Sequence, residues 1–316
     1  MQIIFANDSV RLTRSVVALG NFDGVHKGHT ELIKKAKEKA VLSGLPLCVY
    51  TFWQHPSSFF KGENILITNN SEKEKILESL GVDILYYEDF SEICDMSADD
   101  FCKDILLGRL SCALAVCGGN FTFGKDKSGT SAYLSDTLPK LGARALVVDY
   151  VDESGKIISS SSIREHILRG EMEKAAELLG RPFSIYYPVS HGRHLGTQMG
   201  IPTINQAFEK TKLKPKCGVY ACLCYIDGKK YMGVADVGKK PTVTENTETA
   251  PVLCETHIID FSGDLYGKSI KIDFYTRLRD EKKFDSLATL ILEIQKNIRQ
   301  TREYFKNEKG IAADEN

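Results

Sequence analysis

Two histidines lie three residues apart where an apolar strand is expected to pass into a helix. His26 and His29 follow the apolar run 16–19 and a glycine-rich segment, and they precede an amphipathic helix predicted over 30–42. Glycines allow a tight turn and close approach to a ligand, and a helix N-terminus offers free N–H groups and a positive dipole end. Two imidazoles there suit a phosphate whose negative charge grows in a transition state. The segment therefore predicts a phosphate site.

The same segment could in principle serve a metal, a dinucleotide or only the fold. A zinc site needs further ligands nearby, and the neighbouring sequence offers none. The dinucleotide-binding pattern GxGxxG is absent. A purely structural turn stays open, although such a turn does not need two histidines.

A second glycine-rich segment imitates a different phosphate motif. Residues 119–125 match the first seven positions of a P-loop, but Asp126 stands where a Ser or Thr hydroxyl should hold magnesium. Phe121 and Phe123 inside the segment also fit poorly with a backbone that cradles phosphate. We therefore do not interpret it as a P-loop.

Two further segments combine polar side chains with signals of a turn or a helix start. Four serines at 159–162 open a helix that carries Arg164, and they are either helix caps or a second anion site. In the second half, the glycine-rich segment 192–200 leads to Thr203 and Asn205, which share a face if the chain is extended. Together they could hold a magnesium ion and a phosphate; an ordinary turn is the alternative.

The elements that must position these residues change in character along the chain. In the first half, strands predicted at 16–19, 47–52, 82–87, 113–117 and 145–151 alternate with helices at 30–42, 71–80 and 97–107. The helix at 71–80 is expected to begin with a capping box of Ser71 and Glu74 and to end at Gly81. This alternation predicts an α/β domain with a doubly wound parallel sheet, which binds ligands at the carboxyl ends of its strands.

The second half predicts a small antiparallel β-barrel followed by a helix. Strands are expected at 218–226, 231–237, 252–261 and 269–277, with Asp227-Gly228 as a hairpin turn. The terminal helix is expected to carry one apolar face, which comprises Leu287, Leu290, Ile291, Ile294 and Ile298. A junction at 180–182 then gives domains at 1–182 and 183–306 and a polar tail at 307–316, frayed from about Lys306.

Composition excludes several classes of protein. The 316 residues include 41 Lys and Arg and 42 Asp and Glu, so the net charge of -1 gives no overall attraction to nucleic acid or to an anionic membrane. The nine cysteines, an odd number without a CxxC pair, are expected to be buried reduced thiols. The first residues lack a signal-peptide pattern, and no apolar run approaches the ~20 residues of a membrane span. We expect a soluble, cytoplasmic protein, a monomer or weak homo-oligomer without nucleic-acid or membrane partners.

Several motifs, in order, resemble one known family. Residues 20–29 resemble the GxFDGVHxGH motif of nucleotidyltransferases and, more narrowly, of bacterial bifunctional riboflavin kinase/FAD synthetases. Residues 118–124, 158–164 and 179–183 are similar to that family's GxxFxFG, ISSTxIR and LGRPY segments, with Ser161 where Thr is usual. Residues 192–205 resemble its GRxLGxxxGFPTAN, and 252–257 resemble the strand with its catalytic glutamate. The resemblance runs from about residue 14 to 305.

For the first half, the resemblance implies that FMN attacks the α-phosphate of ATP to give FAD and pyrophosphate. His26 and His29 would stabilise the ATP phosphates, Arg164 would help hold the β- and γ-phosphates as they leave, and Asp23 would orient the loop or a magnesium ion. The implied binding residues around these groups are Gly20, Phe22, Asp23, Gly28, Asn120, Phe123, Ser160 and Ser161. Among them, Ser160 and Ser161 would hold the leaving phosphates, and Asn120 and Phe123 would form the flavin-phosphate side.

For the second half, the resemblance implies that ATP phosphorylates riboflavin to FMN. Glu255 would be the general base, and Thr203 the magnesium ligand. The implied binding residues for Mg-ATP are Gly192, Gly196, Pro202 and Asn205. The substrates are thus riboflavin, FMN and ATP, and the cofactor is Mg²⁺.

The sequence departs from the family pattern at a few positions. Tyr187 replaces a glycine before the first kinase loop, Thr197 replaces an arginine, and Ile204 replaces an alanine. The first two leave open an alternative in which the chain is an FMN adenylyltransferase with a weak or inactive kinase domain. A non-catalytic flavin-sensing or RNA-binding module is a third hypothesis. The intact histidine pair, Glu255 and the balanced charge argue against it.

Overall fold

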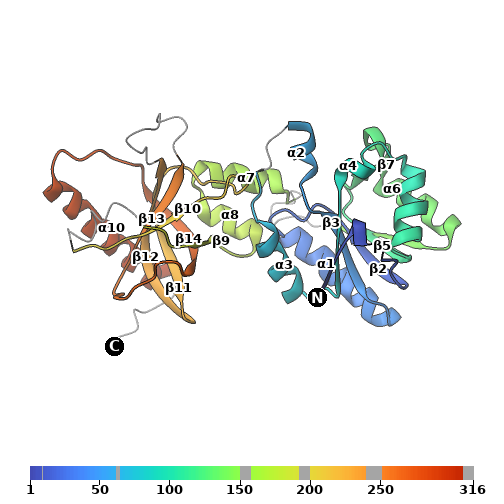
Figure 1. The fold of residues 1–316 in the computed structure, drawn as a ribbon, viewed down its shortest axis with the longest axis horizontal. Helices are drawn as coiled ribbons and strands as arrows, with labels where there is room; N and C mark the ends of the chain where they lie inside the picture. The colour runs from blue at the N-terminus through green and yellow to red at the C-terminus, as the bar shows by residue number, and fades with distance from the viewer. Residues whose placement is uncertain (9, 62–64, 150–157, 192–199, 240–250, 309–316) are drawn as a thin grey trace. The chain divides into compact units, whose positions relative to one another are not determined.

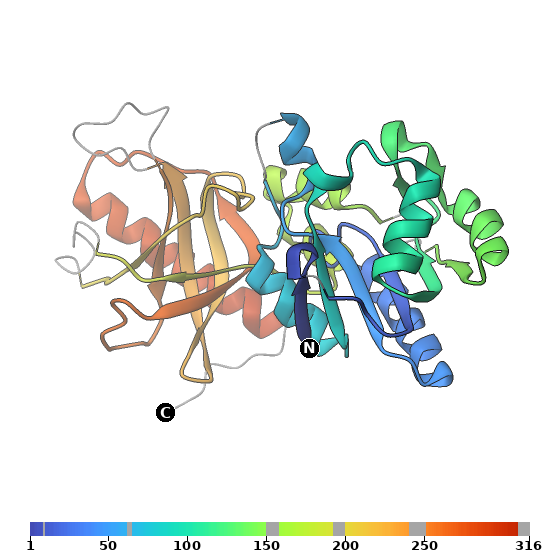
Figure 2. The same cartoon turned by 45° about the vertical axis from the view of Figure 1, so that its right-hand side comes forward.

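The computed structural model describes residues 1–8, 10–61, 65–149, 158–191, 200–239 and 251–308 (Figures 1 and 2). Its contacts divide the chain into two compact units, Met1–Ser160 and Ser161–Asn316. We describe each unit by itself. The predicted class is confirmed, with a parallel α/β sheet in the first unit and a small antiparallel barrel in the second.

A six-stranded parallel sheet forms the centre of the first unit, in the order β1-β4-β3-β2-β5-β8. The strands are β1 (Gln2–Phe5), β2 (Ser15–Leu19), β3 (Leu47–Phe52), β4 (Ile84–Glu88), β5 (Cys112–Cys117) and β8 (Arg144–Val147). The chain passes from β2 to β3 on one side, whereas β5 pairs with β2 on the other. The strand order therefore reverses between β2 and β5, and such a switch point is where open α/β sheets bind ligands.

Helices cover both faces of this sheet. Alternate residues of β2 enter two separate cores: Val17 and Leu19 one, Val16 and Ala18 the other. The core of Val16 and Ala18 is covered by two helices, α1 (Lys27–Ser43) and α3 (Asn70–Ser79). The core of Val17 and Leu19 is covered by α5 (Ala98–Asp100), the π-helical segment Phe101–Arg109 and α6 (Ser131–Thr137) (Figure 2). Other short elements of this unit include α2 (Pro56–Lys61), α4 (Phe90–Ile93) and the hairpin of β6 (Thr122–Phe123) and β7 (Gly129–Thr130).

The predicted cap of the helix at 71–80 is wrong. The N-cap of α3 is Asn69, whose side chain accepts a hydrogen bond from the N–H of Glu72 at 2.9 Å, while Glu72 accepts one from the N–H of Asn69 at 3.0 Å. Asn is as good a cap as Ser, and the same spacing of three to an acidic residue occurs two positions earlier. Ser71 therefore lies inside the helix.

A nearly closed six-stranded antiparallel barrel forms most of the second unit, in the order β10-β13-β12-β11-β14-β9. The strands are β9 (Phe183–Pro188), β10 (Ile204–Ala207), β11 (Gly218–Ile226), β12 (Lys229–Lys239), β13 (Val252–Ile258) and β14 (Ser269–Arg279). A bridge between Ser190 and Asn205 joins the two edges. Asp227 and Gly228 both have positive φ, as the predicted hairpin turn requires. Helices α7 (Ser160–Arg169) and α8 (Met172–Leu179) precede the barrel.

The terminal helix α10 (Leu287–Glu308) packs on β11 and β12 (Figure 1). Its predicted apolar face is only partly buried, and Leu287 is 60% exposed. The fully buried stripe consists of Asn297, Thr301 and Phe305, spaced four apart. Hydrophobicity alone does not identify this stripe, because two of its three residues are polar; all three lie at or beyond the middle of the helix. The helix also continues through Glu308, into the expected polar tail.

The cysteines agree with the expectation of reduced thiols. All nine are free, and seven are buried. No helix among the described segments is long and apolar enough to cross a membrane.

Candidate functional site

The loop that follows β2 is held in an unusual backbone conformation by buried side chains. Phe22 and Val25 have positive φ values of 49° and 36°, and both side chains are fully buried. A side chain at Gly20 would place its Cβ only 3.1 Å from the Phe22 ring. A non-glycine residue at positive φ costs about 1–3 kcal/mol and persists only where its surroundings hold it. The loop is therefore a rigid element, built at the switch point of the sheet.

His26 and His29 lie side by side at the start of α1. Their rings stack with centroids 3.6 Å apart and planes inclined by 17°. His26 is the N-cap of α1, and its Nδ1 accepts a hydrogen bond from the N–H of His29 at 3.3 Å. Because an accepting imidazole nitrogen carries no proton, neutral His26 carries its proton on Nε2. The ring of Phe22 meets His29 edge-on at 5.1 Å and fixes its orientation.

Asp23 links this loop to the segment that precedes α3. Its Oδ1 accepts hydrogen bonds from the N–H groups of Ile67 at 2.9 Å and Thr68 at 3.4 Å, and the residue is 1% exposed. The hydroxyl of Thr68 in turn accepts the N–H of Gly24 at 3.1 Å. Of the two expected roles, loop orientation or magnesium binding, these contacts support loop orientation.

The serine segment at the start of α7 reaches the same loop. Ser160 donates its hydroxyl hydrogen to the carbonyl oxygen of Asp23 at 2.9 Å. The structure thus brings Ser160 together with the histidine loop. Ser161 and Arg164 lie in the first two turns of α7, in the second compact unit.

The turn that follows β5 forms the other side of the switch point. Phe121 donates its N–H to the carbonyl of Gly118 at 3.0 Å, which closes a turn around Asn120. The carboxylate of Asp149 accepts the N–H of Gly119 at 2.9 Å, and Ser131 donates to the carbonyl of Gly119 at 2.8 Å. Since β2 and β5 are parallel neighbours, Asn120 leaves the same edge of the sheet as the histidine loop.

Phe123 is held in an aromatic cluster behind this turn. Its ring lies 4.9 Å from that of Phe101, 5.7 Å from Phe121 and 6.0 Å from Tyr133, and it packs on Gly129. The neighbouring Lys125 forms an ion pair with Asp95 at 2.8 Å. In a P-loop the lysine contacts the nucleotide phosphates. Here the Lys125 ammonium is paired with a carboxylate instead, which supports the interpretation that this segment is not a P-loop.

In the barrel, the proposed kinase residues lie in one row across three strands. Asn205 on β10 is the direct partner of Glu255 on β13, and Glu255 is the direct partner of Asp236 on β12. Directly paired residues point to the same face of a sheet. Asp236 is in turn the direct partner of Val219 on β11, so the row lies on the same face of the sheet as Val219. On that face Val219 and Val234 pack with Ile298 of α10. Thr203 and Pro202 immediately precede β10, while Gly192, Gly196 and Thr197 lie outside the described residues.

His257 supports the Pro202-Thr203 segment from β13. Its Nδ1–H donates to the carbonyl oxygen of Pro202 at 2.9 Å. Tyr187, one of the two departures that left open a weak or inactive kinase, is 3% exposed and packs against Phe208. It is therefore a packing residue of the barrel.

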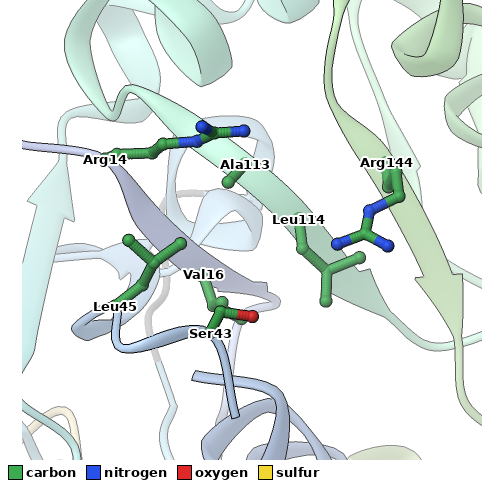
Figure 3. A pocket seen from close by; sticks show the side chains of 7 residues that line it. All are labelled: Arg14, Val16, Ser43, Leu45, Ala113, Leu114 and Arg144. Atoms are coloured by element: carbon green, nitrogen blue, oxygen red, sulfur yellow. The ribbon is translucent and has the colours of Figure 1, made fainter. Parts of the chain in front are cut away.

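A cavity of about 230 Å³ lies at the opposite edge of the parallel sheet (Figure 3). It is at the amino ends of β2, β5 and β8, and is lined by Arg14, Val16, Ser43, Leu45, Ala113, Leu114 and Arg144. Because ligands of such sheets bind at the carboxyl ends, we do not assign the phosphate chemistry to it.

Sequence reasoning missed four polar residues that the structure places at these sites. Thr68, Asp149, Asp236 and His257 contact or neighbour the expected groups. Only His257 had a local signal, because it stands two residues after Glu255 and shares its face of the strand. The other three are brought in by long-range contacts.

Comparisons with known proteins follow the same division. A family model of FAD synthetase matches residues 8–162, and one of riboflavin kinase matches residues 179–305. The bifunctional riboflavin kinase/FMN adenylyltransferase of Bacillus subtilis (strain 168) is 38% identical over 298 residues, 93% of each chain. That of Pseudomonas fluorescens is 32% identical, over 91% of this chain and 92% of the relative.

This chain belongs to the bifunctional riboflavin kinase/FMN adenylyltransferase family. It carries both enzymatic domains of that family, which use ATP as co-substrate, and their joint presence favours the bifunctional hypothesis over an adenylyltransferase alone. A crystal structure of a macrolide-efflux protein from Streptococcus pneumoniae shares the fold, with a TM-score of 0.85 and 31% identity over 96% of this chain and 99% of that one.

Proposed function

We propose that this chain converts riboflavin to FMN in its barrel and FMN to FAD at the switch point of its parallel sheet. The stacked pair of His26 and His29 at the N-terminus of α1 is the observation that carries the second reaction. The cross-strand pair of Asn205 and Glu255 supports the first.

For FAD formation, a phosphate oxygen of FMN attacks the α-phosphorus of ATP, and the bond to the β-phosphate breaks. His26 donates from Nε2 and His29 stands beside it, so both stabilise negative charge on the phosphate in the transition state. Ser160, Ser161 and Arg164 hold the β- and γ-phosphates that leave as pyrophosphate.

The remaining groups shape the binding site for this step. Gly20, Phe22 and Gly28 let the loop and the first turn of α1 approach the nucleotide, and Asp23 anchors the loop. Asn120 and Phe123 form the flavin-phosphate side.

For FMN formation, Glu255 takes the proton from the terminal ribityl hydroxyl of riboflavin, whose oxygen then attacks the γ-phosphorus of ATP; ADP leaves. A positioned base of this kind contributes about 10²–10⁴ in rate. Pro202 presents Thr203 and Asn205 to the nucleotide, and Gly192 and Gly196 are the further residues expected to bind Mg-ATP.

Magnesium fits the oxygen-rich side chains present here. Mg²⁺ takes one or two protein oxygen ligands and completes its shell with phosphates and water. Thr203 and Asn205 offer such oxygens beside the carboxylates of Glu255 and Asp236. Among the described residues, no group of three or more His, Cys, Asp or Glu could hold a metal on its own. When bound, Mg²⁺ would neutralise charge on the transferring phosphate.

We further propose that the adenylyltransferase domain spans 1–182 and the kinase domain 183–306. We also propose that the protein works in the cytoplasm on small molecules, as a monomer or weak homo-oligomer. Buried reduced thiols and a net charge of -1 support that setting.

One assay tests the proposal. The purified protein is incubated with ATP and Mg²⁺ and with either riboflavin or FMN, and the flavins are separated by chromatography. FMN and FAD from riboflavin are expected. FAD formed only from supplied FMN would refute the kinase assignment, and no product from either flavin would refute catalysis.

A further inference from the structure

The barrel has a seam at which its two edge strands, β9 and β10, do not form a regular ladder. β9 pairs with β14 and β10 pairs with β13, and among the described residues a single bridge between Ser190 and Asn205 joins the two edges. The carbonyl oxygen of Asn205 accepts the N–H of Ser190 at 2.8 Å and its hydroxyl hydrogen at 3.1 Å. Because segments held by few contacts open locally, a further attachment is needed to hold β10 at this edge.

Gln206 supplies that second attachment across the seam. It is the direct partner of Cys254, both residues are fully buried, and both side chains point to the same face of the sheet. The amide nitrogen of Gln206 donates to the carbonyl oxygens of Tyr187 on β9 at 2.5 Å and Ile270 on β14 at 2.9 Å. Carbonyl oxygens only accept, so these contacts fix the orientation of the amide. Side-chain N–H groups thus stand in for the ladder that is missing between β9 and β10.

The same amide leaves one buried atom without a partner. Within the described segments, Oε1 of Gln206 meets no hydrogen-bond donor. A buried acceptor in this state costs free energy, which an apolar side chain of similar length would not. Packing alone therefore does not account for an amide here, and its contribution lies in the two hydrogen bonds that it donates.

The seam adjoins the residues proposed to bind Mg-ATP in the kinase. Asn205 directly precedes Gln206, and Thr203 lies two residues before Asn205. Successive side chains of a strand point to opposite faces, so an inward Gln206 turns Asn205 to the face of its cross-strand partner Glu255. A shift of β10 at the seam would therefore move Asn205 and Thr203 relative to Glu255.

We propose that Gln206 and Ser190 form a seam clamp that positions Thr203 and Asn205 for Mg-ATP during riboflavin phosphorylation. This inference rests on the kinase function proposed for the barrel. Neither member of the seam clamp touches substrate in this account. Both act through β10 and are positioning residues.

Three variants test the seam clamp. Gln206→Met keeps the length of the side chain and removes both donors, whereas Ser190→Ala removes only a hydroxyl at an exposed position, which the fold should tolerate. Thr256→Val is the matched control, because it removes a buried hydroxyl of β13 that lies 3.3 Å from the Cys254 sulfur. For each protein, riboflavin phosphorylation is measured as kcat, as KM for ATP and for riboflavin, and as the Mg²⁺ concentration that gives half the maximal rate. Amide hydrogen exchange of residues 203–207 reports on β10 without using activity.

Gln206→Met is expected to raise the KM for ATP about tenfold, since small displacements of binding groups have effects of this size. The half-saturating Mg²⁺ concentration should rise with it. In contrast, kcat at saturating ATP and the KM for riboflavin should change little, and an intact kcat also shows that the barrel is folded.

Ser190→Ala should raise the KM for ATP by about two- to fivefold, a smaller effect because the main-chain hydrogen bond of Ser190 remains. The amides of residues 203–207 should exchange faster in both clamp variants. Thr256→Val should change neither the KM for ATP nor this exchange.

An unchanged KM for ATP and unchanged exchange in Gln206→Met would overturn the inference. Equal changes in Gln206→Met and Thr256→Val would do the same, because they would show a general effect on the barrel. If Gln206→Met does not fold, Ser190→Ala decides, and an unchanged KM and unchanged exchange there would overturn the inference. A wild type that makes no FMN from riboflavin would refute the proposed function instead, and hydrogen exchange of residues 203–207 would still judge the seam clamp.

Discussion

Gly129 packs directly against the ring of Phe123, so one added methyl group there tests how rigid the flavin side of the adenylyltransferase site is. A Cβ at position 129 would lie 2.5 Å from the nearest ring atom, whereas ordinary contact begins at 3.4 Å. The ring would have to move by about 0.9 Å. Phe101, Phe121 and Tyr133 enclose it, and it is 8% exposed, so it has little room.

Gly129→Ala is therefore expected to destabilise the first unit by about 1–3 kcal/mol, the usual cost of overpacking. The single tryptophan, Trp53, lies in that unit, so its fluorescence in a urea titration follows the unfolding of this unit. The KM for FMN in adenylylation should also rise, while kinase activity should not change.

A double mutant separates this clash from other effects of the alanine. Phe123→Leu removes the ring, so Gly129→Ala added to Phe123→Leu should cost less than Gly129→Ala alone. Residues in contact show coupling energies of about 0.5–3 kcal/mol. Strict additivity, or a cost below about 0.5 kcal/mol for Gly129→Ala, would refute the packing argument.

Three further outcomes are expected. His257→Ala removes the hydrogen bond to the carbonyl oxygen of Pro202, which is worth about 1 kcal/mol, so the kinase KM for ATP should rise several-fold. Steady-state kinetics that show an unchanged KM would contradict this. Native labelling by a thiol reagent should modify Cys94 and Cys217 first, since the other seven thiols are buried, and fast modification of all nine would contradict it. Burial lowers the pKa of Lys73 from 10.5 to about 8, so between about pH 8 and 10.5 the unfolded chain binds a proton that the folded chain has lost. The free energy of unfolding should therefore rise over that range by at most about 3 kcal/mol. In urea titrations at several pH values, Lys73→Met should lack this rise.

Local sequence predicted those parts of the fold that depend on local periodicity and turns. The apolar run that became β2, the helix α1 and the Asp227-Gly228 hairpin each have a pattern within a few residues. The sequence also predicted that the histidine pair lies between a strand and a helix, because the strand, the turn and the helix start are adjacent in the chain.

The rest depends on contacts between distant residues. Asp236 stands beside Glu255 only because of the register between β12 and β13. Lys73 looks like an ordinary surface residue of an amphipathic helix, yet the fold buries it and places its ammonium over the ring of Tyr87, 14 residues away. The buried Asn297 stripe of α10 was hidden for a similar reason, since its burial is set by the barrel and not by its own hydrophobicity.

The central claim is that two separate sites catalyse two reactions, and a reciprocal pair of variants tests it most directly. FMN and FAD formation are measured by chromatography for Glu255→Gln and for His29→Ala. Glu255→Gln should lower FMN formation by about 10²-fold or more and leave FAD formation from FMN intact. His29→Ala should lower FAD formation by about 10²-fold and leave FMN formation intact. If either change abolished both activities in a folded protein, the account of two separate sites would be contradicted.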